Sequence, residues 1–142
     1  MTAHQRRFFA ASLAVLLVSG GCGKHGNHAA INGRVALDGQ PLEQGSITFV
    51  PIEGTQGVPT GTDIKNGQYR LSSSNGPAVG WNRVEITAVR PSGKMAADPT
   101  GLPGQQREVY VSAVAARFNA ESTLKVEVHS GDNTANFDVA AE

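Results

Sequence analysis

The sequence predicts an all-β fold, an antiparallel β-sandwich of about seven strands that occupies residues 31–142. Apolar and polar residues alternate in several short segments, and a period of two is typical of half-buried strands. Turn signals such as Asp38-Gly39 and Asn66-Gly67 separate these segments. The 142 residues include 17 Gly and 7 Pro, so one small, turn-rich domain is expected and two would be hard to accommodate.

The four strands expected in the first half of the domain share this alternation, and Gly or Pro signals separate them. Ile47 and Phe49 lie on one face of the second strand. Pro51 is typical of the end or the edge of a strand, because proline cannot donate to a ladder of hydrogen bonds. The expected strands are 31–37, 46–52, 62–64 and 68–71.

The clearest strand follows in the second half, where residues 81–90 turn Val84, Ile86 and Ala88 toward the core. Two C-terminal segments alternate almost as regularly, with a turn signal at Gly131-Asp132-Asn133 between them. We expect these two segments, 124–128 and 135–139, to form a terminal hairpin.

A long connection, residues 91–122, separates the central strand from this hairpin. It begins with Pro and Gly, and it contains a possible short strand at 107–111 and one helical turn at 113–117. A connection of this length in a small domain is either functional or mobile.

The N-terminus, residues 1–21, is predicted to be an export signal, because two arginines precede an apolar run that is too short to span a bilayer. Small residues follow, and the stretch 18–22 resembles the lipobox of bacterial lipoproteins. This resemblance implies that Cys22 is lipidated after the leader is removed, and residues 22–30 would then tether the domain. The alternative is an ordinary secretory signal that leaves a free thiol.

Composition excludes several classes of function. Lys plus Arg and Asp plus Glu both number 12, and only 6% of residues are aromatic, so the chain lacks the features of a nucleic-acid binder. The single Cys cannot form an intrachain disulfide, a cysteine zinc site or an iron–sulfur cluster. His25 and His28 lie on the expected tether without a third ligand, so we predict neither a metal site nor a cofactor.

The turn motifs carry a family resemblance. Residues 32–42, with the Asp-Gly-Gln-Pro-Leu turn, lead to Gly45 and a second strand, and Thr62-Asp63 precedes the segment Asn66–Leu71. This arrangement resembles carboxypeptidase-regulatory-like domains, which occur in many small bacterial lipoproteins. The resemblance implies a transthyretin-like (prealbumin-like), Ig-like β-sandwich, and it indicates no activity because turn chemistry specifies fold.

Three aromatic side chains are candidates for ligand binding. Trp81, the only Trp, lies at the start of the central strand on the polar side, where it could stack on a sugar ring. Tyr69 and Tyr110 are the further stacking candidates. The alternative for Trp81 is a rim residue that covers the end of the sandwich.

Other polar residues have plainer explanations. No nucleophile motif surrounds any serine, and His129 lies on the solvent side of a strand, so no catalytic residue is predicted. Asp63 with Asn66 is typical of an Asx turn rather than of a calcium loop. Arg70, Arg83 and Glu85 are expected to form a charge ladder on the solvent face.

Together these features predict a lipid-anchored, extracytoplasmic β-sandwich that is not an enzyme. It would act as a binding or structural module at the cell envelope, on the outer membrane if there are two, with a protein or polysaccharide partner. The connection 91–122 is the expected binding surface, because loops on a rigid scaffold commonly carry function. A carbohydrate-binding module is the alternative, and an enzyme would need a pocket that joins His129 to Asp132 and a serine.

Overall fold

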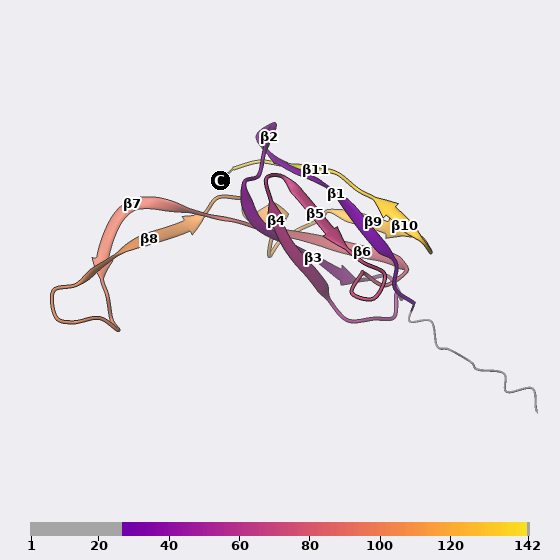
Figure 1. The fold of residues 1–142 in the computed structure, drawn as a ribbon, viewed down its shortest axis with the longest axis horizontal. Coiled ribbons are helices and arrows are strands. Elements are labelled where there is room, and N and C mark those ends of the chain that lie inside the picture. Colours follow the sequence, from indigo (N-terminus) through magenta and orange to yellow (C-terminus); the bar gives the residue numbers. More distant parts are fainter. Residues whose placement is uncertain (1–26, 142) are drawn as a thin grey trace, which may run out of the picture.

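A computed structural model describes residues 27–141, and this part of the chain is nearly all β (Figure 1). Predictions for the export signal and Cys22 lie outside the described residues. The one helix of the described part is the 3-10 turn η1, Ala116–Phe118. The strands are β1 Ala30–Leu37, β2 Gln40–Pro41, β3 Gln44–Pro51, β4 Thr60–Lys65, β5 Gln68–Leu71, β6 Gly80–Thr87, β7 Val89–Ala97, β8 Gln106–Ser112, β9 Lys125–Val128, β10 Asp132–Thr134 and β11 Phe137–Val139.

Most strands form one curled sheet in the order β10-β1-β5-β4-β3-β6-β9, with β2 and β11 also paired to β1. Pairing is antiparallel except along β1, which pairs with β10 and β11 in parallel, so the expectation of a purely antiparallel fold is wrong at this edge. Neighbours β4 and β5 share a single residue pair, Lys65 with Gln68, next to the turn that joins them. The sheet is therefore weakly joined at this point.

The predicted turns are confirmed. Asp38 and Gly39 have φ of 51° and 79°, and Asn66 and Gly67 have φ of 50° and 71°. Each pair lies between two directly paired strand residues, which is the geometry of a two-residue hairpin turn with positive φ at both positions. Asn, Asp and Gly tolerate this conformation better than other residues do.

The predicted core faces are also confirmed. Ile47, Phe49, Val84 and Ile86 are fully buried, and their polar neighbours along β3 and β6 are more exposed. Tyr69 packs between Phe49 and Phe137, with ring centroids 6.0 and 6.5 Å away. Burying each Ile, Val or Phe contributes about 1.5–3 kcal/mol, so this single cluster holds the sheet in its curled form.

The expected terminal hairpin is wrong. β9 pairs with β6, whereas β10 and β11 pair with β1 at the other edge of the sheet. Asn133 fixes this crossing, because its side chain accepts from the His129 N–H and donates to the carbonyl of Ala30. Alternation along the two segments specifies which side chains face inward, but it does not specify the neighbouring strand.

The long connection is largely a β-hairpin. β7 and β8 pair with each other and extend away from the other strands as an arm, residues 89–112 (Figure 1). The expected strand 81–90 is divided at Ala88, whose carbonyl accepts from the Ala113 N–H. Residues 113–115, expected to begin a helical turn, are instead buried outside any helix, directly before η1.

The folded domain begins earlier than the sequence predicts. Ala29, assigned to the tether, is 1% exposed, and its N–H donates to the Pro77 carbonyl. The His28 ring Nδ1 lies 2.9 Å from the carbonyl oxygen of Gly76 and donates to it. Residues 27–30 therefore pack against the loop that precedes β6.

Candidate functional site

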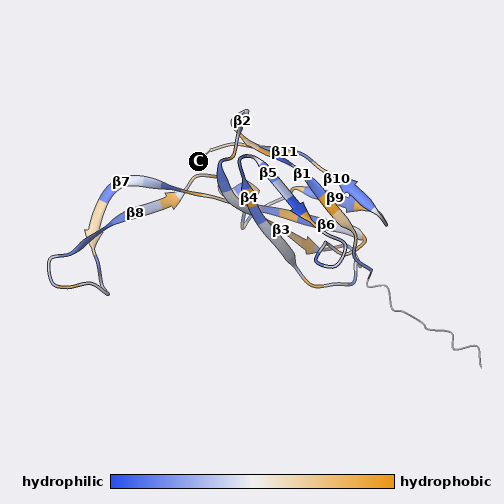
Figure 2. Ribbon diagram, in the orientation of Figure 1, coloured by the Kyte–Doolittle hydropathy of each residue, from blue (hydrophilic) through white to orange (hydrophobic). Residues whose placement is uncertain are grey.

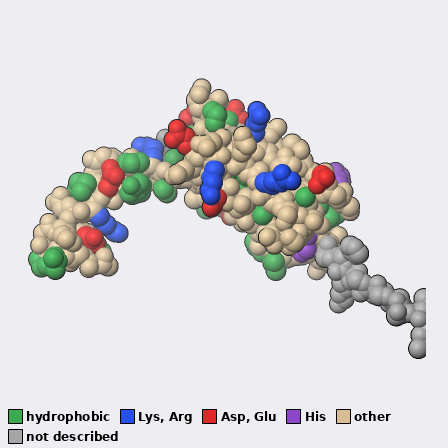
Figure 3. Space-filling view, in the orientation of Figure 1, with side chains coloured by type: hydrophobic (Ala, Val, Ile, Leu, Met, Phe, Trp, Pro, Cys, Tyr) green, Lys and Arg blue, Asp and Glu red, His purple; other side chains and the backbone are tan. Residues whose placement is uncertain are grey.

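The arm is rich in exposed apolar side chains. Five of the seven large hydrophobic side chains exposed in the described part lie on it. Parts of its ribbon have the orange colour of hydrophobic residues in Figure 2, and apolar side chains are visible along it in Figure 3. These five are Val89, Met95, Leu102, Tyr110 and Val111. Exposed apolar residues that cluster in this way mark interaction sites more often than scattered ones do.

Cross-strand pairing decides which of these side chains share a face, because directly paired residues project to the same side of a sheet. One side, which we call the apolar face, combines Val89, Pro91, Met95 and Tyr110. The pairs on it are Val89 with Ser112, Pro91 with Tyr110, Met95 with Glu108, and Ala97 with Gln106. The opposite side pairs Arg90 with Val111 and Ala96 with Arg107, and is therefore more basic.

The outer edges of the arm have backbone N–H and C=O groups that are available to pair with another strand. β7 and β8 pair only with each other within residues 27–141, so both outer edges of the ribbon are open. At the tip, Asp98 accepts from the backbone N–H and the hydroxyl of Thr100 at 2.9 and 2.8 Å, and these bonds lower the pKa of its carboxyl. Leu102, 72% exposed, projects from the loop at the tip of the arm, which these hydrogen bonds hold in place.

The three aromatic candidates lie apart. Trp81, 39% exposed, is the second residue of β6, whereas Tyr110 is 56% exposed on the arm that leaves the other end of β6. The six residue-to-residue steps from Trp81 to Thr87 span about 20 Å, so these two rings do not form one platform. Tyr69 is 4% exposed and donates its O–H to the Ala135 carbonyl at 2.7 Å; burial raises its pKa.

A polar groove of about 820 Å³ lies over β1, β4, β5 and the β10–β11 segment. Asn32, Arg34, Lys65 and Arg70 contribute exposed polar side chains, and the ring of Tyr69 lines it from below. Lys and Arg side chains are visible on this face in Figure 3. The sequence did not reveal the groove, because β1 and β5 become neighbours only when the chain between them folds back.

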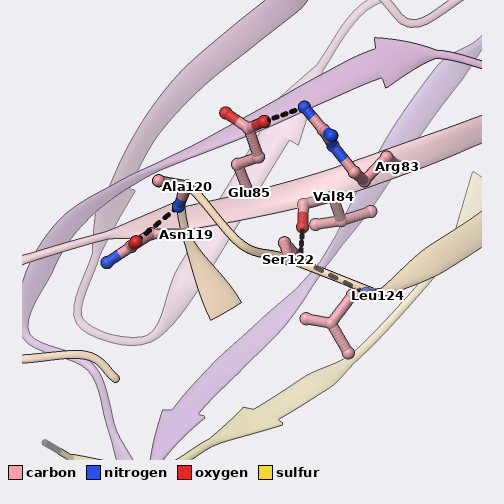
Figure 4. Close-up of polar contacts among 7 residues, drawn as sticks. All are labelled: Arg83, Val84, Glu85, Asn119, Ala120, Ser122 and Leu124. Atoms are coloured by element: carbon pink, nitrogen blue, oxygen red, sulfur yellow. Dashed lines mark hydrogen bonds and ion pairs between the residues drawn. The ribbon is translucent and has the colours of Figure 1, made fainter. Parts of the chain in front are cut away.

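The expected charge ladder is only partly formed. Arg83 Nη2 lies 2.5 Å from Glu85 Oε1 on β6 (Figure 4), but Arg70 is on β5, separated from β6 by two strands. Figure 4 also shows Ser122, whose hydroxyl donates to the Val84 carbonyl and accepts from the Leu124 N–H at 3.2 Å. These contacts fix the segment after η1 against β6 and therefore have a structural role.

The remaining polar candidates lie on the surface. His129 is exposed beyond the end of β9, and its backbone N–H bonds to Asn133. Within residues 27–141, no three His, Cys, Asp or Glu side chains lie close enough together to hold a metal ion. The same residues include no helix of the length and hydropathy needed to cross a membrane.

No protein-family model, curated protein or solved structure matches this chain. The resemblance to carboxypeptidase-regulatory-like domains therefore stays a prediction.

Proposed function

We propose that the protein is a lipid-anchored, extracytoplasmic β-sandwich that acts as a non-catalytic binding module at the bacterial cell envelope. In this proposal the arm binds an envelope protein. The observation that carries it is the concentration of exposed apolar side chains on a hairpin that extends away from the rest of the domain.

The curled sheet supports the sandwich architecture. One layer would contain β1, β5, β10 and β11, and the other would contain β4, β3, β6 and β9. The single Lys65–Gln68 pair is the joint between the two layers. Phe49 on β3 and Tyr69 on β5 meet across the core, as residues of two facing layers do.

The position of the arm supports the anchored orientation. Residues 22–27 reach at most about 18 Å, so a lipid on Cys22 would hold the start of the folded domain close to a membrane. His28 bridges to Ala78 just before β6, whereas the arm leaves the opposite end of β6. The arm therefore lies at the far end of the domain from residue 28 (Figure 1), where a partner could reach it.

The chemistry of the arm favours a protein partner. An apolar face suits another apolar protein surface, and an open edge can pair with an extended strand. A two-stranded ribbon is only marginally stable in water, so binding would order it further. Sugar stacking would need an aromatic platform, and Trp81 lies too far from Tyr110 to form one with it.

Site-specific photo-crosslinking in the native cells tests this proposal. A photoreactive residue at Tyr110 is expected to capture one envelope protein in stoichiometric amount, and the same residue at Val58, which is 68% exposed outside the arm, is not. Met95→Ser combined with the Tyr110 crosslinker should reduce the adduct. Equal labelling from Tyr110 and Val58, or an adduct with a second copy of the chain or with glycan alone, would refute a protein partner of the arm.

The anchor needs its own measurement. Cys22→Ala should prevent incorporation of a labelled fatty acid and should leave the protein either unprocessed or released from the membrane fraction. Normal processing and membrane attachment of this variant would contradict the lipoprotein prediction and would leave the role of the arm unaffected.

A further inference from the structure

We propose that the polar groove is a second binding site, and that its ligand is an acidic polysaccharide. The inference is independent of the arm, because the groove is formed by β1, β4, β5 and the β10–β11 segment.

Strand pairing arranges the outward side chains of the groove in two rows. Thr134, Asn32 and Arg70 lie in one row across β10, β1 and β5. In the second row, Asn136 bonds to Arg34, Arg34 pairs with Gln68, and Gln68 pairs with Lys65. Neighbouring strands are about 4.8 Å apart, so the second row extends over about 14 Å. This length suits an extended chain of sugar residues better than a single small ion.

The charge of the groove favours an anion. Arg34 and Arg70 are exposed, and neither is among the three ion pairs formed within residues 27–141. Lys65 lies 4.0 Å from Asp63, but both side chains are more than 70% exposed, so water screens this pair. The whole chain has equal numbers of acidic and basic residues, whereas the groove gathers three basic side chains and one acidic one. This face therefore attracts anions although the chain as a whole does not.

The two arginines are spaced to bind neighbouring acidic groups on one polymer. Arg34 pairs directly with Gln68, and Arg70 lies two residues further along β5, which makes the two arginines diagonal neighbours. Diagonal neighbours in a sheet are about 7–8 Å apart at the backbone, within reach of long side chains. Each guanidinium can bind a carboxylate through two parallel hydrogen bonds.

Amide and hydroxyl groups beside the arginines suit the sugar hydroxyls. Asn136 accepts from the Arg34 backbone N–H at 2.8 Å through Oδ1, which leaves its Nδ2 group as a donor. Gln68 and Thr134 add further donors and acceptors on the same face. The groove contains no exposed large apolar side chain that could hold a peptide, since the seven such residues of the described part lie elsewhere.

The floor of the groove is rigid under β1, β5 and the β10–β11 segment. Gly33 lies against the Ala135 carbonyl, which also accepts the O–H of Tyr69 at 2.7 Å, and the Ala135 N–H donates to Asn32 at 3.0 Å. The backbone beneath the side-chain rows is therefore tightly packed here, so little backbone ordering is required when a ligand binds.

Calorimetric titration of the mature chain with polygalacturonate, a polymer of uronic acid, tests the proposal. Neutral dextran and inorganic sulfate serve as comparison ligands. We expect binding to polygalacturonate that weakens as salt increases, with no binding to dextran. Loss of one charged hydrogen-bonding partner should cost about tenfold in affinity or more, so Arg34→Gln and Arg70→Gln should each show at least this loss.

Arg90→Gln and Arg107→Gln on the arm are matched controls, because they remove the same charge from exposed positions outside the groove. They should change the affinity less than about twofold. No binding to polygalacturonate, an equal loss in the arm variants, or equally tight binding of sulfate would overturn the proposal. Circular dichroism confirms that each variant is folded, and none of these results bears on the protein partner of the arm.

Discussion

Gly33→Ala tests the parallel crossing of β1 with the C-terminal segment. A Cβ at this position would lie 1.7 Å from the Ala135 carbonyl oxygen and 3.0 Å from Cε1 of Tyr69. Real Cβ atoms do not approach backbone oxygen so closely, so the segment between β10 and β11 must move away from β1. The substitution therefore removes the pairing that distinguishes this topology from a terminal hairpin.

The cost follows from the contacts that this movement breaks. The Tyr69 O–H bond to Ala135 and the Ala135 N–H bond to Asn32 contribute about 1 kcal/mol each, and the crowding itself costs about 1–3 kcal/mol. We therefore expect Gly33→Ala to lower the free energy of unfolding by about 3–5 kcal/mol, a large share of the roughly 5–15 kcal/mol that stabilises a typical domain.

Urea unfolding followed by Trp81 fluorescence measures this change, and Gly39→Ala is the control. Gly39 has a φ of 79°, and no atom lies within 4 Å of the place that an added methyl group would occupy, so Ala there introduces backbone strain without a clash. That strain costs about 1–2 kcal/mol. If Gly33→Ala proved no more destabilising than Gly39→Ala, β1 would not lie against Ala135, and the parallel pairing of β1 would be refuted.

Three further outcomes are expected. Burial raises the pKa of Tyr69 above its unfolded value near 10, so the folded state holds the phenol proton more tightly than the unfolded state does. The contribution of Tyr69 to the free energy of unfolding is therefore complete below about pH 10. Above that pH the contribution declines by up to about 1.4 kcal/mol per pH unit. Urea unfolding measured at several pH values above about 10 should show this decline of the free energy of unfolding in the native chain and a shallower decline in Tyr69→Phe. Val84→Asp should lower the free energy of unfolding by about 4 kcal/mol or more, because it places an unpaired charge at a fully buried position. Val126→Asp should lower it by less, because Val126 is half-buried. The reverse order would contradict the assigned faces of β6 and β9. Replacing the distal arm, residues 95–108, with Asn-Gly should change stability by less than about 1 kcal/mol, and global unfolding in a thermal scan would show that the arm belongs to the core.

The sequence predicted the local features well, because these depend on neighbouring residues. Asn66-Gly67 forms the expected hairpin turn since both residues tolerate positive φ, and Val84 and Ile86 are buried as the alternation on β6 indicates. The nearly all-β class follows from the same alternation.

The neighbours of the C-terminal strands could not be predicted in the same way. The turn signal at 131–133 is compatible with a hairpin, but Asn133 instead bonds to Ala30 across about a hundred residues of sequence. The sequence pattern does not predict the arm either, because the irregular pairing between Pro91 and Met95 interrupts the alternation that would indicate a strand at β7. The missed arm has this local cause, whereas the wrong hairpin concerns a contact between distant segments.

The same limitation explains why the two proposed binding surfaces could be identified only in the structure. Tyr69 was a stacking candidate because it is aromatic, yet its packing against Phe49 and its bond to Ala135 place it beneath the groove. Arg34 and Arg70 are 36 positions apart and carry no motif, but the pairing of β1 with β5 makes them diagonal neighbours. Because the groove and the arm share no strand, either surface can be altered while the other is preserved. Variants confined to one surface therefore separate an effect on glycan binding from an effect on the protein partner.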